Sequence, residues 1–246
     1  MLARSVHAEV LDGLAAEDPA AVRARGDLRR IHRVMGTCGI LRRAVRRCLD
    51  GRRGAAPLRI LELGSGDGTL MLRLARLLAP RWPGATLCLL DREPLLRAAT
   101  LDAYAALGWT VRPERIDVLQ WASRADGGGG AAGGNWDLIV ANLFLHHFEG
   151  AALAGLMRSI GERCNGFVAV EPRRSRLALS ASHLVGALGA NAVTREDAVL
   201  SVRAGFRGAE IGALWSAPQG DWTCREYAAG LFSHVFLAMR RAPEAP

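Results

Sequence analysis

A glycine-rich turn at residues 62–69, with the sequence E-L-G-S-G-D-G-T, is the part of the chain best suited to bind a small molecule. It lies between an apolar run at 58–61 and a helical pattern of leucines at 70–78, which indicates the order strand, turn, helix. Gly64 and Gly66 let the backbone approach a ligand that any side chain would block, and free amides at the helix start point toward that ligand. We therefore expect a cofactor site at the carboxyl end of this strand.

The acidic residues of this turn indicate the kind of cofactor. A dinucleotide-binding turn has a third glycine where this chain has Thr69, and carboxylates at Glu62 and Asp67 would repel a pyrophosphate. The turn instead resembles the first motif of class I S-adenosylmethionine-dependent methyltransferases, whose cofactor carries an amino group and a sulfonium and no phosphate. The resemblance implies that S-adenosylmethionine is bound by Glu62, Gly64, Ser65, Gly66, Asp67 and Thr69. The alternative is a structural glycine turn that happens to follow a strand.

Two more acids follow the next predicted strands. Asp91 closes an apolar run about twenty residues past the glycine turn, an offset that suits binding of a ribose diol. The resemblance implies that Asp91 binds the ribose hydroxyls, that Arg92 packs beside the adenine, and that Asp117 and Val118 lie at the adenine amine. Asp91 is alternatively the N-cap of a helix before Pro94, and both roles are compatible.

The stretch A-N-L-F-L-H-H-F at 141–148 separates subclasses of the family. Enzymes that methylate an amine of adenine or cytosine usually carry an Asn/Asp-Pro-Pro-aromatic turn here, which this chain lacks. The stretch resembles that of small-molecule methyltransferases of ubiquinone and menaquinone biosynthesis, and this resemblance implies that Asn142 and Leu143 border the cofactor. His146 and His147 are candidate general bases, because an imidazole with a pKa of about 6.5 accepts a phenol proton at neutral pH. We expect at most one of them to face the methyl group; catalysis by positioning alone is the alternative.

An arginine cluster follows the fifth predicted strand, which ends at Glu171. Arg173, Arg174 and Arg176 could hold a carboxylate or stabilise a phenolate in the acceptor. Arg173 is therefore a further candidate catalytic residue. The alternative is a solvated helix start, with Glu171 paired to one of the arginines.

Seven strand patterns would place these residues at one edge of a sheet. They lie at 58–61, 85–90, 109–118, 136–142, 166–171, 222–227 and 231–239. The first five alternate with helices, as in a doubly wound α/β fold, and the last two resemble a closing antiparallel hairpin joined near Gly230. We also expect helices at 177–188 and 194–206, the second capped by Thr194 and lying over the acceptor pocket. The expected fold is the seven-stranded, Rossmann-like sheet of class I methyltransferases, with a flexible glycine-rich loop at 126–134.

Residues 1–54 form an arginine-rich region before the predicted methyltransferase domain at 55–246. Residues 27–36 predict a basic amphipathic helix, which the segment 36–41 interrupts, and an apolar stripe then continues in a second helix. The first interpretation is a helical lid over cofactor and acceptor. A membrane-surface helix for a lipid-like acceptor and an RNA-contacting patch are the alternatives.

Composition narrows the choice of partners. The net charge of +8 is carried by arginine alone, since the chain has no lysine, and such a bias is explained by a GC-rich genome. No run of interleaved basic and aromatic residues marks a nucleic-acid platform. The five cysteines include no C-x-x-C pair, so we predict no metal site, no disulfide framework and a cytoplasmic location. We expect neither export nor a transmembrane segment, which leaves peripheral contact as the remaining membrane interaction.

The sequence therefore predicts transfer of a methyl group from S-adenosylmethionine to an oxygen or carbon of a small aromatic acceptor, such as a phenol, quinol or polyketide. Similar methyltransferases are encoded beside type III polyketide synthases in bacteria, which suggests quinone or polyketide biosynthesis. Two alternatives come from other classes: an RNA methyltransferase that uses the basic N-terminal region, and a non-catalytic S-adenosylmethionine-binding scaffold. The oligomeric state is left open.

Overall fold

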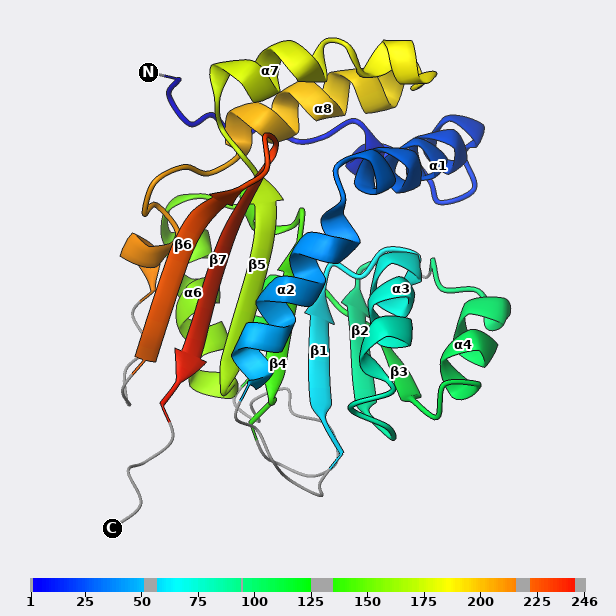
Figure 1. Cartoon of the computed structure of the whole chain (residues 1–246). Helices are drawn as coiled ribbons and strands as arrows, with labels where there is room; N and C mark the ends of the chain where they lie inside the picture. Colours follow the sequence, from blue (N-terminus) through cyan, green and yellow to red (C-terminus); the bar gives the residue numbers. More distant parts are fainter. Residues whose placement is uncertain (1, 51–56, 94, 125–134, 216–221, 242–246) are drawn as a thin grey trace.

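The computed structural model describes residues 2–50, 57–93, 95–124, 135–215 and 222–241. Its strands are β1 (Arg59–Leu63), β2 (Thr86–Asp91), β3 (Thr110–Arg115), β4 (Leu138–Asn142), β5 (Gly166–Pro172), β6 (Trp222–Ala229) and β7 (Ser233–Arg240). They form a seven-stranded sheet in the order β3-β2-β1-β4-β5-β7-β6 (Figure 1). The strands β1 to β5 run parallel, and β7 runs antiparallel to both β5 and β6. The predicted sheet and its closing hairpin are confirmed, whereas the predicted loop at 126–134 lies outside the described residues.

Helices cover both faces of the sheet (Figure 1). On one face lie α2 (Thr37–Leu49), α3 (Thr69–Leu78) and α4 (Ala98–Ala105), and on the other α5 (Val118–Ser123) and α6 (Gly150–Arg163). Successive strand residues point to opposite faces, so Ile60 packs in the first core and Leu61 in the second. The central strands are buried on both sides, which explains their continuous apolar runs. Pro113 is tolerated because β3 is an edge strand.

A helical cap lies beyond the carboxyl ends of the parallel strands (Figure 1). It contains α1 (Pro19–Val34), α7 (Arg176–Ser182) and α8 (Ala192–Ala204), and α1 packs against α8. Short 3-10 helices complete the chain: η1 (Leu11–Gly13), η2 (Leu145–His147), η3 (Val185–Leu188) and η4 (Gly212–Leu214). No helix in these described ranges is long and apolar enough to cross a membrane.

Several predicted boundaries were wrong. The strand expected at 109–118 ends at Arg115, and Val118 begins α5. The helix expected at 177–188 ends at Ser182 and is followed by η3. The N-cap of α8 is Asn191, whose side chain accepts a hydrogen bond from the amide of Thr194 (2.9 Å), so Thr194 lies inside the helix. The break between the basic helices is confined to Met35 and Gly36, where Gly36 has a φ of 66°.

The two N-terminal helices have different surroundings. In α2, Leu41, Val45 and Leu49 are buried in the core on one face of the sheet. In α1, Leu28 and Arg29 border the main cavity described below. Of the predicted lid at 1–54, the part before α2 therefore covers the cavity, and α2 belongs to the core layer.

Candidate active site

The main cavity, of about 530 Å³, lies at the carboxyl ends of β1, β2, β3 and β4. The strand order reverses between β1 and β4, and an open α/β sheet usually binds its ligand at such a point. The predicted cofactor-binding residues all border this cavity: Glu62, Gly64, Ser65, Gly66, Asp67, Thr69, Asp91, Arg92, Asp117, Val118, Asn142 and Leu143. Of the predicted catalytic residues, His147 borders it; His146 and Arg173 are absent from its described wall.

The glycine turn bends the chain from β1 back toward β2. The amides of Gly64 and Ser65 donate to the carbonyl of Leu90 (2.9 and 3.1 Å). The amide of Gly66 donates to Oδ2 of Asp91 (2.8 Å). Gly64 and Gly66 have φ values of 67° and 54°, a left-handed conformation that glycine adopts without steric strain. The turn therefore holds the backbone, rather than side chains, against the cavity.

Asp67 ends the glycine turn and joins it to α1. Its Oδ1 accepts hydrogen bonds from the amide and the hydroxyl of Thr69 (3.0 and 2.6 Å), and its Oδ2 pairs with Arg29 of α1 (2.7 Å). Burial opposes ionisation of Asp67, but the contacts with Thr69 and Arg29 outweigh it and hold the pKa of this carboxyl below its usual value. The ion pair thus ties α1 to the opposite wall of the cavity, and sequence reasoning did not identify Arg29.

Four buried polar atoms on the cavity wall have no hydrogen-bond partner among the described residues. They are Oε2 of Glu62, Oγ of Ser65, Oδ1 of Asn142 and Nε2 of His32. Burial, together with two nearby aspartates, raises the pKa of Glu62 well above its usual value. Burial also lowers the pKa of His32 to about 4, so this imidazole is neutral at pH 7. Buried polar groups are almost always paired, and a ligand that carries both donors and acceptors would pair these.

Asp91 and Asp117 each contact backbone amides while bordering the cavity. Oδ1 of Asp91 accepts from the amide of Glu93 (3.0 Å), and Oδ1 of Asp117 accepts from the amide of Leu119 (2.7 Å) as the N-cap of α5. The predicted N-cap role of Asp91 is wrong, because the next described helix is α4 and its N-cap is Arg97. An ionised carboxylate has about four acceptor sites, so both aspartates retain acceptor capacity toward a ligand.

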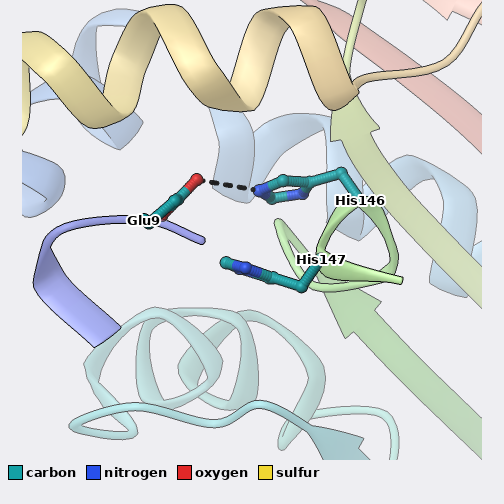
Figure 2. A group of neighbouring side chains, drawn as sticks. All are labelled: Glu9, His146 and His147. Carbon is teal, nitrogen blue, oxygen red and sulfur yellow. Dashed lines mark hydrogen bonds and ion pairs between the residues drawn. The ribbon is translucent and has the colours of Figure 1, made fainter. Parts of the chain in front are cut away.

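The two adjacent histidines have different environments (Figure 2). His146 is 2% exposed, with Nδ1 2.8 Å from Oε2 of Glu171 and Nε2 3.2 Å from Oε1 of Glu9. Burial alone would lower the pKa of His146, but the hydrogen bonds to two carboxylates raise it to about 9. His147 borders the cavity with Nδ1 3.4 Å from Oδ2 of Asp12, and burial next to His146 lowers its pKa. Of the two candidate bases, His147 is the one placed to reach a ligand.

Glu171 supports the segment that carries the histidines. It is fully buried and accepts hydrogen bonds from the amides of Phe144 and Leu145 (3.1 and 2.9 Å) as well as from His146. The possible pairing of Glu171 with a neighbouring arginine is absent from the described ion pairs, in which its partner is His146. Glu171 therefore stabilises the start of η2.

Arg173, Arg174 and Arg176, which follow β5, are absent from the described walls of the main cavity and of the second cavity considered below, so anion binding by them stays a prediction. The guanidinium of Arg173 donates to the carbonyl of Gly230 (3.4 Å), in the turn between β6 and β7. Arg174 is buried and pairs with Glu210 (2.5 Å), and it also donates to the carbonyl of Leu2. In this position Arg174 fastens the N-terminal residues to the fold.

Leu143 connects β4 to η2 in a strained conformation. Its φ is 49°, which costs an L-residue about 1–2 kcal/mol. The conformation positions the next residue, Phe144, so that a Cβ on Gly64 would lie 2.2 Å from the Phe144 ring. Strain of this kind concentrates at functional sites, and Leu143 borders the main cavity and also a second one.

The segment at residues 2–18, which we term the N-terminal strap, forms a wall of the main cavity; sequence reasoning placed it within the predicted lid at 1–54 but singled out none of its residues. Its residues on the main cavity are Val6, His7, Ala8, Leu11, Asp12, Leu14 and Ala16. Arg4 holds the strap by donating to the carbonyls of Phe148 and Ala204 (both 2.8 Å). The amides of Val10 and Leu11 donate to Asp197 of α8 (2.7 and 3.0 Å). The available signal was a set of ionisable residues, among them His7, Glu9 and Asp12, within an otherwise largely apolar segment.

A second cavity, of about 350 Å³, lies between the strap, α1, α7, η3 and α8. Its wall is mostly apolar, with contributions such as Ile31, Val185 and Val202. Leu11, Leu28 and Leu143 border both cavities. Residues of α8 border this second cavity, which is next to the main one; its use by an acceptor stays a prediction.

Comparison with known proteins identifies the fold. No protein-family model matches the chain, and no curated protein matches its sequence. The plantazolicin methyltransferase BpumL, crystallised with SAH and a monoazolic desmethylPZN analog, aligns over 91% of both chains with 14% identity and a TM-score of 0.62. An O-methyltransferase family protein from Burkholderia thailandensis aligns over 93% of this chain with 17% identity and a TM-score of 0.57. The chain spans 62% of the length of that protein.

A third structure extends the comparison. Magnesium protoporphyrin IX methyltransferase from Synechocystis PCC 6803, with bound SAH, aligns over 94% of this chain and 91% of its own length, with 14% identity and a TM-score of 0.51. At such low identities these matches establish the fold alone. The chain therefore has the Rossmann-like methyltransferase fold, including the antiparallel β6-β7 hairpin, as the sequence predicts.

Proposed function

We propose that the protein is an S-adenosylmethionine-dependent methyltransferase that acts on a small molecule. The observation that carries this proposal is the group of unpaired buried polar atoms, on Glu62, Ser65, Asn142 and His32, around the glycine turn. They lie where the fold binds its ligand, at the reversal of strand order. Both acceptors and neutral donor-acceptor groups are present, which suits a ligand with an amino group, hydroxyls and a heterocycle.

The charges of the cavity fit this cofactor. Glu62 is buried and its Oε2 is unpaired in the described part of the chain, so an ammonium group of a ligand would satisfy it. Asp91 has acceptor capacity for ribose hydroxyls, and Asp117 with Val118 borders the cavity at the end of β3. His32 is neutral and Arg29 is already paired with Asp67. The cavity is therefore suited to a cationic ligand and poorly suited to a pyrophosphate.

Bound S-adenosylmethionine would supply a methyl group that is activated by the adjacent sulfonium. The protein's own contribution is to hold the acceptor in the correct position and to exclude water. His147 borders the cavity, and its lowered pKa keeps the imidazole neutral at pH 7. In this proposal a ring nitrogen of His147 accepts the proton of the acceptor hydroxyl. His146 and Arg173 take no direct part, because neither borders the described cavity.

The second cavity supports an apolar, aromatic acceptor of the phenol, quinol or polyketide class. Its apolar wall meets the main cavity at Leu11, Leu28 and Leu143, so an acceptor bound there can extend toward the methyl group. Two of the similar structures are methyltransferases named for plantazolicin and for magnesium protoporphyrin IX, which are small molecules. Methylation of oxygen or carbon in quinone or polyketide biosynthesis is the proposed setting.

An RNA substrate is less compatible with the arrangement of the basic helices. In α1, Arg29 pairs with Asp67 and Arg30 pairs with Asp27. The apolar stripe of α2 is buried against the sheet. These ion pairs account for two arginines of α1, and phosphate binding through the other basic residues would predict affinity that falls steeply with salt.

Isothermal titration with S-adenosylmethionine and SAH tests the proposal. We expect saturable binding to the wild type, loss of binding in Asp91→Ala and Gly64→Val, and unchanged binding in Asp102→Ala, which replaces an exposed aspartate of α4. Transfer of a labelled methyl group to phenols, quinols and RNA then identifies the acceptor class. A folded wild type that binds neither compound would refute the proposal. Binding without transfer to any acceptor would favour the scaffold alternative.

A further inference from the structure

Three potential metal ligands converge between the two cavities. Glu9 comes from the N-terminal strap, and His146 and His147 come from η2. One ligand atom of each lies within 4.8 Å of the others, and Figure 2 shows the Glu9 carboxylate facing the imidazole edge of His146 with His147 alongside. Two imidazoles and one carboxylate are a donor set that suits divalent first-row metals such as Zn²⁺, Fe²⁺ and Co²⁺.

The spacing of these atoms matches a shared metal ion. Oε1 of Glu9 lies 3.2 Å from Nε2 of His146, and two ligands of a tetrahedral metal with bonds of about 2.0–2.1 Å are separated by about 3.4 Å. The rings of His146 and His147 lie side by side, with centroids 4.3 Å apart and an interplanar angle of 31°. The three ligand atoms lie within 4.8 Å of one another, so the side chains would have to approach by up to about 1.4 Å for all three groups to bind one ion.

Carboxylates behind the histidines orient them as in known metal sites. Oε2 of Glu171 lies 2.8 Å from Nδ1 of His146, which leaves Nε2 directed at Glu9. Asp12 approaches the second histidine in a similar way, with Oδ2 3.4 Å from Nδ1 of His147. A ligating histidine usually donates its other ring N–H to a carboxylate or a carbonyl, which fixes its tautomer.

The local charge favours a cation. Glu9, Asp12 and Glu171 surround the two histidines, and among the described ion pairs none of these three carboxylates has an arginine partner. The chain has no lysine that could supply a charge. Arg4 is nearby, and its guanidinium donates hydrogen bonds to backbone carbonyls, including that of His146. Three carboxylates therefore face the two histidines, and a metal ion would displace the proton of His146, whose pKa of about 9 keeps it protonated at pH 7.

We propose that Glu9, His146 and His147 bind one divalent transition metal ion. Three protein ligands leave a coordination position open, as in catalytic zinc sites, and His147 places that position beside the main cavity. This inference changes the role given above to His147, from proton acceptor to metal ligand. It is independent of the cofactor, because metal binding can be measured without S-adenosylmethionine.

The test uses untagged, full-length protein that has been dialysed against a chelator. Zn²⁺ is titrated by calorimetry, and Co²⁺ is titrated while its visible d–d absorption is recorded. We expect one metal ion per chain and a cobalt spectrum of four- or five-coordinate type. Glu9→Gln and His147→Ala should each weaken Zn²⁺ binding at least about tenfold. The matched controls Glu17→Gln and His183→Ala, which change exposed residues, should bind like the wild type.

Two outcomes would overturn the proposal. One is a folded wild type that binds neither metal ion, in which case the cluster is an ion-pair contact that holds the strap. The other is binding that persists unchanged in Glu9→Gln and His147→Ala, which would place the metal elsewhere, for example at a cysteine. Circular dichroism of each variant separates loss of a ligand from loss of the fold, and titration with SAH tests the proposed function separately.

Discussion

Two buried glutamates, near the carboxyl ends of β1 and β5, differ in how completely the protein pairs their carboxylates. Glu171 on β5 is 0% exposed and accepts hydrogen bonds from the amides of Phe144 and Leu145 and from His146. Glu62 on β1 is 4% exposed, and its Oε2 has no partner within the described chain. One carboxylate is fully paired by the protein, and the other is left with unused acceptor capacity at the cavity.

The difference separates structural from ligand-binding groups. A buried charge is tolerated when it is paired and hydrogen-bonded, and an unpaired one lowers stability. The wall formed by β5 and η2 is therefore complete without a ligand. The wall formed by β1 and the glycine turn contains the buried, unpaired carboxyl of Glu62. The loss of stability that this carboxyl causes is explained by a role in ligand binding. The two walls touch where the ring of Phe144 packs against Gly64.

The largest effect is expected at Glu171. Glu171→Gln removes the charge that pairs with His146 and replaces one acceptor oxygen by a donor facing backbone amides. Breaking a buried pair costs about 3–5 kcal/mol, so we expect the free energy of unfolding in urea to fall by about 3 kcal/mol or more at pH 7. Glu162→Gln, at an exposed position of α6, is the control. A loss below about 1 kcal/mol would mean that Glu171 is not the support of η2.

The contact between the two walls is tested at Gly64. Gly64→Ala combines left-handed strain with a Cβ placed 2.2 Å from the Phe144 ring, and we expect a destabilisation of about 2–4 kcal/mol. Gly84→Ala has a similar φ of 69° but no heavy atom within 4 Å of the new Cβ, so about 1–2 kcal/mol is expected. Thermal unfolding of both variants measures the difference. Equal losses would show that Phe144 moves aside without cost.

Glu62 is expected to affect binding and not stability. Glu62→Gln keeps the shape of the side chain and removes a buried, unpaired charge, so stability should stay the same or rise. A hydrogen bond to a charged group contributes about 1.5–3 kcal/mol, and its loss should weaken SAH binding about 10- to 100-fold. Calorimetric titration with SAH measures the expected loss of affinity, and unfolding in urea measures the free energy of unfolding. If Glu62→Gln lost stability but kept its affinity for SAH, Glu62 would be a structural residue and not a ligand-binding one.

The smallest effect is a proton linkage at Glu62. Burial raises its pKa above the ordinary 4.5 in the folded protein, so the unfolded chain loses this proton first, and stability falls as the pH rises from 4.5 toward the folded pKa. A ligand ammonium favours the ionised form, so binding should release up to about one proton in that pH window. Titration of SAH in buffers of different ionisation enthalpy measures the release, and Glu62→Gln should abolish it.

Most of the fold was predictable because its signals are local. Apolar runs identified the parallel strands β1, β2, β4 and β5, and the turn at 62–69 located the cavity. The edge strand β3 is largely polar, and its predicted range extended into α5. The helix caps were less accessible: Thr194 and Asn191 are both good capping residues, and the sequence does not show which side chain turns toward the free amides. The break near Gly36 was overestimated for the same reason.

The candidate site was predictable on one wall only. Glu62, Asp91 and Asn142 follow strands, so topology brings them together. Glu9 and His146 are 137 residues apart in the sequence. Neither residue belongs to a sequence motif that would predict their contact. This contact also decides which of the two histidines borders the cavity. The strap and Glu171 surround His146, and His147 is left at the cavity wall.

The strap also dictates an order of events during synthesis. Arg4 and Val10 emerge from the ribosome early, yet their hydrogen-bond partners Ala204 and Asp197 lie 200 and 187 residues further along the chain. Contacts of such long range form late, because closing the intervening loop is costly until the rest of the chain is ordered. A nascent chain that ends before α8 has made β1 to β5 and the glycine turn but cannot enclose the cavity. Completion of the site thus requires that the chain has been made through α8.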